Sequence, residues 1–444
     1  NHTLWYYAID NGGTSETTHS APLPIDTVAP TVTPSLSGTM GIGDWYRGAV
    51  SFSLQVTDAT SGPAAARYSL DGGPWLTYSG PVQVTAQGTH TINYYATDVA
   101  GNSSAVDVVN FKIDAHPPVS TITFPAAGQA LSGGSITIQG TSTDGSGSGL
   151  SNVEISINGG AWMPTSGTTS WTYSWTPPGP GQHNLRVRAT DLAQNVEDPG
   201  SGVYFVVDTS RPSSTIASPF AGEIVRGPTV VVTGTAADTY SGVAVVEVSD
   251  NGGATWAAAT LDAGGATWTY QWTPANDGAF TLRSRATDRA GNVEVPGSGV
   301  SVQVDSIAPQ TIITTPGSGQ YVRASLVVVA GTAADVGSGV KRVEVSIDGG
   351  PWVVASGTLS WTYTWSPIGD DGPHTIRARA TDNAGNVESP GASVLVIVDN
   401  GAPTSTITQP LSGQVVTSDV VVIAGASADA VSGVAQVRIT IRRG

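Results

Sequence analysis

Aspartates recur at three fixed places in a repeated sequence, and carboxylates so placed could bind a metal cation. One belongs to the motif, or phrase, ATDRAGNVE at residues 286–294. The motif recurs as ATDVAGNSS from Ala96, ATDLAQNVE from Ala189 and ATDNAGNVE from Ala380, and a divergent copy, AIDNGGTSE, begins at Ala8. A second stands in phrases such as VVDTSRP and QVDSIAP, and a third shortly precedes a Ser-Gly pair, as in AADTYSGV. The elements that carry these phrases decide whether the carboxylates meet.

The second phrase sets the period of the repeat. Its successive aspartates are 88, 94, 97 and 94 residues apart, namely Asp26, Asp114, Asp208, Asp305 and Asp399. Such a period indicates whole domains in series, because solenoid units are only about 20 to 50 residues long. We predict four complete domains, named the first to fourth repeats, at residues 27–114, 115–208, 209–305 and 306–399. Residues 1–26 are predicted to be the C-terminal fragment of one more domain, and residues 400–444 the N-terminal fragment of another.

Within each repeat the sequence predicts β-strands. In the third repeat, apolar residues alternate with polar ones in VVVTGTAAD, VAVVEVSD, ATWTYQWTP, FTLRSRATD and VSVQVD, each bounded by turn-forming residues. With SSTIASP and the stretch around Trp256, the count is seven strands, named A, B, C, C′, E, F and G, in just under 100 residues. We therefore predict an all-β chain of tandem seven-stranded Ig-like or fibronectin-III-like sandwiches arranged end to end. Trp268, Tyr270 and Trp272 share one face of strand E and are expected in the core.

The outer face of strands C and F carries opposite charges. Glu residues on strand C are expected to face Arg residues on strand F across the sheet surface, at Glu154, Glu247 and Glu344 and at Arg186/Arg188, Arg283/Arg285 and Arg377/Arg379. A tryptophan also recurs near the CC′ hairpin, at Trp75, Trp162, Trp256 and Trp352. These indoles either pack against the edge of the sandwich, which we favour, or stack on a sugar if they are exposed.

Composition excludes several function classes. The chain of 444 residues has 34 acidic and 18 basic side chains, a net charge of -16, which disfavours nucleic acid as a partner and suits metal cations. It has no cysteine for disulfides or thiolate chemistry, and no run of about 20 apolar residues that would predict a membrane span. Its six histidines form no HExxH motif, and those at His90, His183 and His374 are expected in a turn before strand F. We predict that the chain is not an enzyme.

The phrases VDxxAP, AxDxxSGV, xDGGxW and ATDxAGNVE, in this order, resemble the bacterial Ig-like repeat modules of large cell-surface and adhesin-type proteins. The resemblance covers essentially the whole chain, and residues 1–114 follow a variant of the pattern that lacks the WTYxW strand. It implies a non-catalytic extracellular structural protein: a rod, filament or stalk segment of a prokaryotic cell-surface protein. Expected partners are neighbouring copies of itself or further repeats of the same chain, with any cell-surface or glycan ligand outside this segment. The alternative is carbohydrate-binding or spacer modules of an exported glycan-active enzyme.

Topology predicts where the aspartates meet. In a seven-stranded sandwich the N-terminus, the BC loop and the FG loop gather at one pole, so three carboxylates should converge there in each repeat. The predicted sets are Asp26, Asp58 and Asp98; Asp114, Asp144 and Asp191; Asp208, Asp238 and Asp288, with Asn292 as a further oxygen donor; and Asp305, Asp335 and Asp382. Calcium, a hard cation with six to eight oxygen ligands, would relieve the repulsion between them. Calcium at such junctions is also what the resemblance implies, although turn capping by the same side chains without a metal explains the motif equally well.

The two terminal fragments carry an expectation of their own. Half a sandwich exposes its core and its strand edges, so it should not be ordered alone. We expect further residues of a longer protein, or strands from another chain, to complete each fragment.

Overall fold

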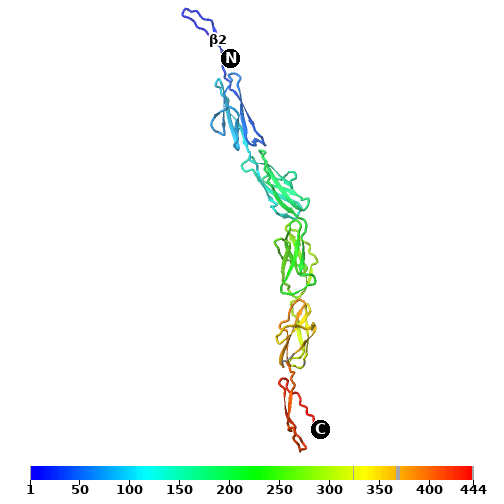
Figure 1. Cartoon of the computed structure of the whole chain (residues 1–444). Coiled ribbons are helices and arrows are strands. Elements are labelled where there is room, and N and C mark those ends of the chain that lie inside the picture. Colours follow the sequence, from blue (N-terminus) through cyan, green and yellow to red (C-terminus); the bar gives the residue numbers. More distant parts are fainter. Residues whose placement is uncertain (1, 324, 367–370, 443–444) are drawn as a thin grey trace. The chain divides into compact units, whose positions relative to one another are not determined.

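The protein consists of strands and loops (Figure 1), and the residues that the structure describes form no helix. The structure is a computed structural model that describes residues 2–323, 325–366 and 371–442. Residue 1 of the first predicted fragment and residues 443–444 of the last therefore lie outside the described residues. The chain divides into two compact units, residues 1–210 and 211–444. The predicted all-β class of tandem Ig-like sandwiches is confirmed.

The first unit contains the first and second repeats. Its strands are β1 (His2–Tyr6), β2 (His19–Leu23), β3 (Thr31–Ser37), β4 (Trp45–Tyr46), β5 (Val50–Thr57), β6 (Pro63–Leu70), β7 (Leu76–Thr77), β8 (Val82–Val84), β9 (Gly88–Asp98), β10 (Asp107–Ile113), β11 (Val119–Phe124), β12 (Ala130–Leu131), β13 (Ile136–Thr143), β14 (Leu150–Ile157), β15 (Met163–Pro164), β16 (Ser170–Trp175), β17 (Gly181–Asp191) and β18 (Val203–Val207). The first repeat forms the sheets β3-β5-β8 and β4-β10-β9-β6-β7, and the second forms β11-β13-β16 and β12-β18-β17-β14-β15. Within the described residues, β1 and β2 form a separate two-stranded sheet.

The second unit contains the third and fourth repeats. Its strands are β19 (Ser213–Ser218), β20 (Ile224–Val225), β21 (Val230–Ala237), β22 (Val243–Ser249), β23 (Ala257–Ala258), β24 (Thr260–Leu261), β25 (Thr267–Trp272), β26 (Gly278–Asp288), β27 (Val300–Val304), β28 (Gln310–Thr315), β29 (Tyr321–Val322), β30 (Val327–Ala334), β31 (Val340–Ile347), β32 (Val353–Val354), β33 (Ser356–Gly357), β34 (Ser360–Trp365), β35 (Gly372–Asp382), β36 (Ala392–Val398), β37 (Thr404–Gln409) and β38 (Ala424–Ala428). The third repeat forms β19-β21-β25-β24 and β20-β27-β26-β22-β23, and the fourth forms β28-β30-β34-β33 and β29-β36-β35-β31-β32.

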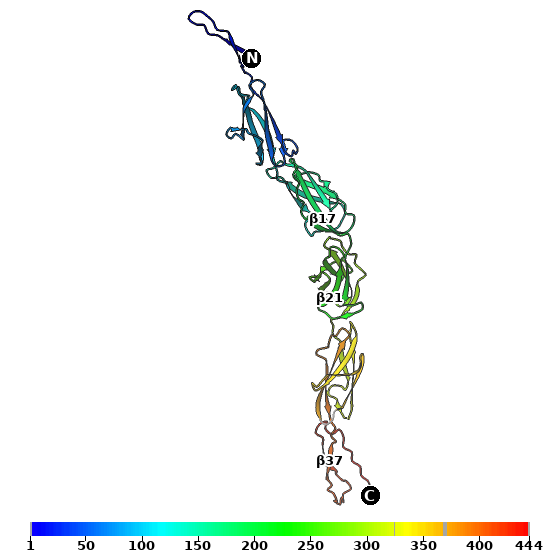
Figure 2. The same cartoon turned by 45° about the horizontal axis from the view of Figure 1, so that its top comes forward.

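These sheets have the topology expected of an Ig-like sandwich. In the third repeat, A (β19), B (β21) and E (β25) form one sheet, whereas G (β27), F (β26), C (β22) and C′ (β23) form the other. Strand F, labelled β17 in the second repeat (Figure 2), is 11 residues long and ends on the aspartate of the ATD phrase. The FG and BC loops therefore start at the same end of the sandwich.

The structure adds one short strand, A′, to the predicted seven. In the third repeat, A ends at Ser218, next to Pro219, which has no N–H to donate to a ladder. The chain then crosses to the other sheet, where Ile224 and Val225 pair in parallel with strand G. The third and fourth repeats also have a second two-residue strand, β24 and β33, beside strand E. A two-residue strand is too short to show a period of two, so the sequence pattern did not predict these.

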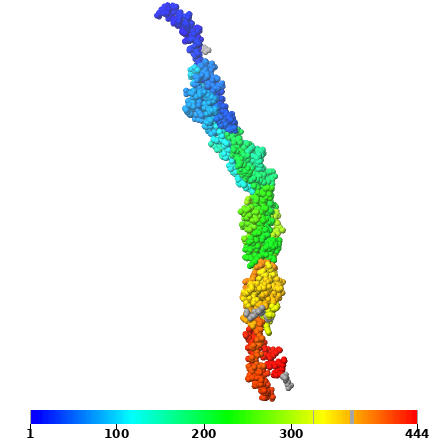
Figure 3. All heavy atoms as spheres, in the orientation of Figure 1, coloured from blue at the N-terminus to red at the C-terminus, as the bar shows by residue number. Residues whose placement is uncertain are grey.

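The core lies between the two sheets of each repeat. Trp268 and Trp272 are each 1% exposed and pack with Val232, Leu282 and Val302, which confirms their predicted place. Clustered apolar side chains pack between the two sheets of the second and third repeats, and Figure 3 shows the outer surface that encloses them, coloured along the sequence. The loops at the ends of the sandwich thus stand on a rigid frame.

Candidate metal centre

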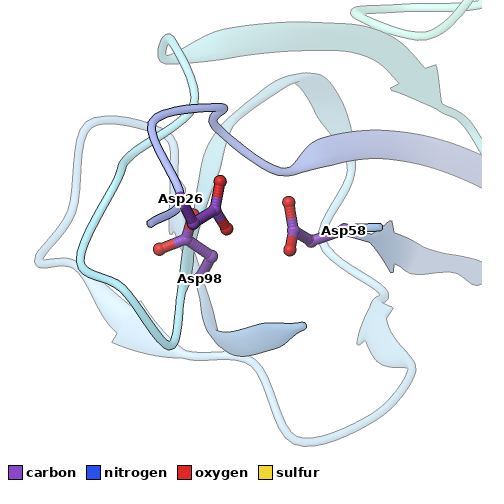
Figure 4. A group of neighbouring side chains, drawn as sticks. All are labelled: Asp26, Asp58 and Asp98. Carbon is purple, nitrogen blue, oxygen red and sulfur yellow. The ribbon is translucent and has the colours of Figure 1, made fainter. Parts of the chain in front are cut away.

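The first repeat brings its three predicted aspartates together at one pole. Asp26 lies in the linker before strand A, Asp58 directly follows strand B, and Asp98 ends strand F. Their side chains face one another (Figure 4), and one oxygen of each lies within 4.8 Å of the others. Two ligands of one calcium ion can be about 5 Å apart, twice the usual Ca–O distance of about 2.3 to 2.6 Å. The set is therefore compact enough to share one ion.

The second and fourth repeats contain the same arrangement, more deeply buried. One oxygen from each of Asp114, Asp144 and Asp191 lies within 4.8 Å of the others, and the same holds for Asp305, Asp335 and Asp382. In each set the linker and FG-loop aspartates are buried and the BC-loop aspartate is half-buried. In the remaining set, Asp208 belongs to the first unit, whereas Asp238 and Asp288 belong to the second, where they begin the BC loop and end strand F.

The FG-loop aspartate caps its own turn in every repeat. In the third repeat, Asp288 Oδ1 accepts a hydrogen bond from the backbone N–H of Asn292 at 2.8 Å, and Asp288 Oδ2 accepts one from Asn292 Nδ2, also at 2.8 Å. Asp98, Asp191 and Asp382 make the same pair of contacts. The turn-capping role is therefore observed, and it is compatible with metal binding because each carboxylate oxygen can accept further contacts.

The asparagine of the motif acts as a hydrogen-bond donor. Asn292 was predicted to supply an oxygen ligand, which stays a prediction, and its amide nitrogen donates to Asp288 Oδ2. In the other complete sets this nitrogen also donates to the linker: Asn195 Nδ2 lies 3.0 Å from the carbonyl oxygen of Asp114, and Asn386 Nδ2 lies 3.0 Å from that of Asp305. The asparagine thus ties the linker to the FG loop as a hydrogen-bond donor.

One carboxylate oxygen of the fourth repeat has no hydrogen-bond partner among the described residues. Asp335 Oδ2 accepts the N–H of Gly339 at 2.6 Å, and Asp305 Oδ2 accepts the N–H of Ser338 at 2.7 Å. Asp335 Oδ1 is buried and accepts none. A buried polar atom left unpaired costs about 1 to 3 kcal/mol, so this oxygen is positioned to interact with a cation.

The electrostatics differ between the first two sets. Burial raises the pKa of Asp144 and of Asp191, and the charge of Asp114 raises both further, against hydrogen bonds that lower them. In the more open first set, hydrogen bonding by Ser61 lowers the pKa of Asp26. The carboxylates of the second repeat therefore repel one another in a poorly solvated site, where a cation would relieve more repulsion than in the first.

The FG turn requires a left-handed residue after the alanine. Gly101, Gly291 and Gly385 have φ of 92°, 91° and 90°. Gln194, in the equivalent position, keeps φ at 70°, so the position demands this conformation even where the sequence does not supply glycine. The Gln194 carbonyl oxygen accepts a hydrogen bond from Arg47 Nη1 of the first repeat at 3.2 Å.

The alternative glycan surface is largely covered. The predicted Glu–Arg pairs form with the second arginine of each pair, because Glu154, Glu247 and Glu344 lie opposite Arg188, Arg285 and Arg379. These guanidinium groups lie 4.3, 4.4 and 4.3 Å from the ring centroids of Trp162, Trp256 and Trp352. None of the described cations lies over Trp75 of the first repeat, which is 40% exposed and packs edge-on against Tyr95. Packing against the sheet thus accounts for three of the four indoles.

The recurring histidines lie in strand F and not in a turn as expected. His90, His183 and His374 each occupy the third position of their F strand. His90 Nδ1 lies 2.8 Å from Asp71 Oδ2 and His374 Nδ1 lies 2.7 Å from Asp348 Oδ2, at the CC′ turn. They join the CC′ turn to strand F, a structural contact.

The sequence reading missed the glutamate that ends the repeated phrase. Glu294 Oε1 accepts the N–H of Ser214 on strand A at 2.8 Å, and its Oε2 accepts the Ser214 hydroxyl at 2.6 Å and the N–H of Ala286 on strand F at 2.8 Å. Glu197 and Glu388 also link strand A to strand F. The constant place of Glu eight residues after the alanine was the available signal.

The fold and the pole geometry define a tandem array of Ig-like β-sandwiches with an acidic junction site. The sequence profile described as "Bacterial Ig domain" matches residues 118–187, 212–294 and 309–378, together half of the chain. The chain belongs to this family, which confirms the resemblance. Such repeats are generally non-catalytic and are common on extracellular proteins.

Comparisons with individual proteins add little. No curated protein matches. Among solved structures, the chain is similar to the fibronectin(III)-like modules of Clostridium thermocellum CbhA, with 23% identity, 42% of this chain and 94% of that chain covered, and a TM-score of 0.30. It is also similar to the dimeric latent PorU of Porphyromonas gingivalis, with 15% identity, 69% and 35% covered, and a TM-score of 0.19. Neither likeness carries a functional argument. In the described part of the chain, no helix has the length and apolarity needed to cross a membrane.

Proposed function

We propose that this chain is a non-catalytic structural spacer, a segment of a stalk, filament or adhesin on a bacterial cell surface, with calcium bound at the poles of its repeats. One observation carries the proposal. Asp305 directly follows strand G of the third repeat, where its N–H donates to the carbonyl oxygen of Val225, and one of its carboxylate oxygens lies within 4.8 Å of those of Asp335 and Asp382 in the fourth repeat. A linker residue shared by two repeats suits a chain whose task is to hold successive domains at a set spacing.

Calcium would bind through the aspartate sets. The three carboxylates of a set supply three of the six to eight oxygens that calcium takes, and loop carbonyls and water supply the rest. The proposed ligands are Asp26, Asp58 and Asp98; Asp114, Asp144 and Asp191; Asp208, Asp238 and Asp288; and Asp305, Asp335 and Asp382. Asn292 and its counterparts position the loops as donors.

The cellular role is tested by antibody labelling of intact cells. Antibodies raised against the repeats should label unpermeabilised bacteria that express the parent protein. Labelling that requires permeabilised cells would contradict the surface role. A glycan-binding role is less favoured because arginine covers three of the four candidate indoles.

Calcium is expected to stabilise the repeats. At a calcium concentration about 100 times the dissociation constant, each occupied site should add about 2.7 kcal/mol to the stability of its repeat. Hydrogen exchange followed by mass spectrometry on the whole chain, with calcium or with a chelator, resolves the repeats separately. Asp335→Asn should abolish the calcium-dependent protection of the fourth repeat and preserve that of the second.

A matched control is Asp348→Asn, which removes a charge from the CC′ turn of the same repeat, away from the set. It should leave the calcium response unchanged. Equal exchange with calcium and with chelator in wild type would leave the aspartates as turn caps alone, and the spacer role would then rest on the cell labelling.

The calcium response should depend on pH differently in the first two repeats. The raised pKa values of Asp144 and Asp191 mean that, without metal, the second repeat loses stability as the pH rises through those values. At a pH above these raised pKa values, bound calcium offsets this loss of stability. At a pH near them, calcium competes with protons for the carboxylates. The lowered pKa of Asp26 has the opposite effect on the first repeat. Ionised Asp26 stabilises this repeat at any pH above the ordinary aspartate pKa, and the stabilisation is lost only as the pH falls through the lowered pKa.

As the pH falls, the calcium effect should therefore disappear in the second repeat before it does in the first. The check is the calcium-dependent shift in melting temperature against pH, compared between Asp144→Asn and Asp58→Asn, each of which silences one site. Identical pH midpoints for the two variants would show that the pole environments do not differ as described.

A further inference from the structure

The outer sheet face of the first repeat differs from that of the other three. In those repeats, a glutamate of strand C lies opposite an arginine of strand F, and the guanidinium group stacks on the indole near the CC′ hairpin. In the first repeat, the two opposite positions hold Arg67 and Tyr95, while Trp75 keeps the place of the indole. A guanidinium group therefore stands where the other repeats have a carboxylate, and a phenol stands where they have a guanidinium group.

The exchange leaves an aromatic pair in contact with solvent. The rings of Trp75 and Tyr95 meet edge to face, with their centroids 4.9 Å apart. Trp75 is 40% exposed and its neighbour Leu76 is 47% exposed, and no cation of the described residues lies over the indole. The electron-rich face of an indole attracts the weakly positive C–H groups on one side of a sugar ring. The pair therefore forms a platform on which a sugar can stack.

The same face carries positive charge that no carboxylate balances. Residues of strands C, F and G of the first repeat alternate between the core and this face. The outward positions of these strands hold two cations, Arg67 and Lys112, and no Asp or Glu among the described residues. Neither cation forms an ion pair within the described part of the chain. In a chain with 34 acidic and 18 basic side chains, this local surplus of positive charge favours an anionic ligand.

Neutral polar groups lie beside the aromatic platform. Asn93 stands two residues before Tyr95 on the outward side of strand F, about 7 Å away along the strand, where the other repeats carry an arginine. Thr77 of strand C′ is exposed and lies opposite Arg67. Amide and hydroxyl groups donate and accept hydrogen bonds, as sugar hydroxyls do. One guanidinium group among neutral polar groups suits a sparsely charged sugar better than an acidic peptide, in which each carboxylate needs its own cation.

We propose that the outer face around Trp75 and Tyr95 binds an acidic glycan, a sugar chain that carries carboxylates. A sugar ring stacks on Trp75, its carboxylate accepts hydrogen bonds from Arg67, and its hydroxyls bond Asn93 and Thr77. A planar guanidinium group binds a carboxylate through two parallel N–H···O bonds, which give both affinity and orientation. The binding site goes beyond the proposed spacer function and requires no calcium. It lies in the variant first repeat, outside the three ranges that the bacterial Ig profile matches.

The test is binding of the whole chain to an array of acidic oligosaccharides, with isothermal titration calorimetry on those that bind. The array holds oligogalacturonate, alginate, hyaluronan and sialyllactose, together with their methyl esters, which keep the sugar rings and lose the charge. We expect at least one acidic sugar to bind, its ester to bind about tenfold more weakly or less, and added salt to weaken the acidic sugar. Binding to none of the acidic sugars, equal binding of acid and ester, or equally tight binding of oligoglutamate would overturn the proposal.

Variants locate the binding site on the first repeat. Trp75→Ala should weaken binding by about tenfold or more, whereas Trp256→Ala, at the indole that arginine covers in the third repeat, should leave it unchanged.

A second variant protects the test against a loss of folding. Arg67→Glu combined with Tyr95→Arg introduces the pair that the other three repeats use, so the first repeat should stay folded, as hydrogen exchange can verify. The new arginine should cover the indole and the new carboxylate should repel the ligand, so binding should be lost. Wild-type affinity in this double variant, or equal effects of Trp75→Ala and Trp256→Ala, contradicts the assigned site. Cell labelling does not depend on this outcome, so a failed glycan site and a failed surface role are distinguishable.

Discussion

Trp361→Ala is expected to destabilise the fourth repeat by about 3 to 5 kcal/mol, the usual cost of deleting a large aromatic side chain from a core. Trp361 is 1% exposed and packs with Val329 and Val345 between the two sheets. The neighbouring strands B and C cannot close the space without breaking their ladders. Urea denaturation followed by hydrogen exchange in the fourth repeat measures the loss, and the second repeat, which keeps Trp171, is the internal control.

The indole also explains why strand B carries a glycine. A Cβ at Gly331 would overlap the Trp361 ring and the carbonyl oxygen of Ile312. Gly331→Ala alone should cost about 1 to 3 kcal/mol by overpacking. The double variant should cost less than the sum of the two single variants, because the ring contact is removed while the backbone contact remains. If the stability losses of the two single variants add exactly in the double variant, the glycine is not required by the packing of the indole.

The first repeat gives the reverse case. Leu54 stands four residues before Asp58, as Gly331 stands four residues before Asp335. This repeat lacks the WTYxW strand, and the N–H of Leu54 instead donates to the hydroxyl of Tyr78 at 3.0 Å. With no indole opposite, the position can hold a side chain. The variant repeat that the sequence singled out is thus a different packing solution on the same topology.

The strands and their order were predictable because alternation, turn residues and the length of the repeat all favour one sandwich topology. The convergence of Asp114, Asp144 and Asp191 followed from that topology alone, since it depends only on which loops share a pole. The strand A′ was not predictable, because two residues have no periodicity. The orientation of the Asn195 amide was not predictable either, since it is set by which carbonyl the linker presents.

The missed glutamate shows a second limit of sequence reading. Glu294 stands in an exposed-looking turn phrase, and its side chain reaches across to strand A, 80 residues earlier in the chain. Local turn chemistry explains the Asp and Asn of the phrase but says nothing about such a distant partner. Only the stacking of the two sheets places Ser214 within reach.

Glu294→Ala is expected to destabilise the third repeat by about 3 kcal/mol. The change leaves the N–H groups of Ser214 and Ala286 without their acceptor. Each unsatisfied buried donor costs about 1 to 3 kcal/mol, and water recovers part of this cost at Ser214, which is half-buried, but not at the buried Ala286. Because one carboxylate joins strands of opposite sheets, its loss should free strand A at the edge of its sheet. The measurement is hydrogen exchange, in which the amide of Ser214 should lose protection at lower denaturant than strands C and F.

Two variants define the cause. Glu294→Gln keeps one acceptor oxygen and should lose less stability, whereas Val293→Ala, at a neighbouring side chain that is 43% exposed, should change little. The first repeat supplies a natural comparison, since Ser104 takes the place of the glutamate. Its hydroxyl accepts the N–H of Ala96 at 3.0 Å and donates to the carbonyl of Ala105 at 3.1 Å, and neither partner lies on strand A. Strand A of the first repeat is therefore expected to exchange faster than strand A of the third. If Glu294→Ala lowers the free energy of unfolding no more than Val293→Ala does, the two sheets are held together by the core alone and the glutamate side chain adds no stability.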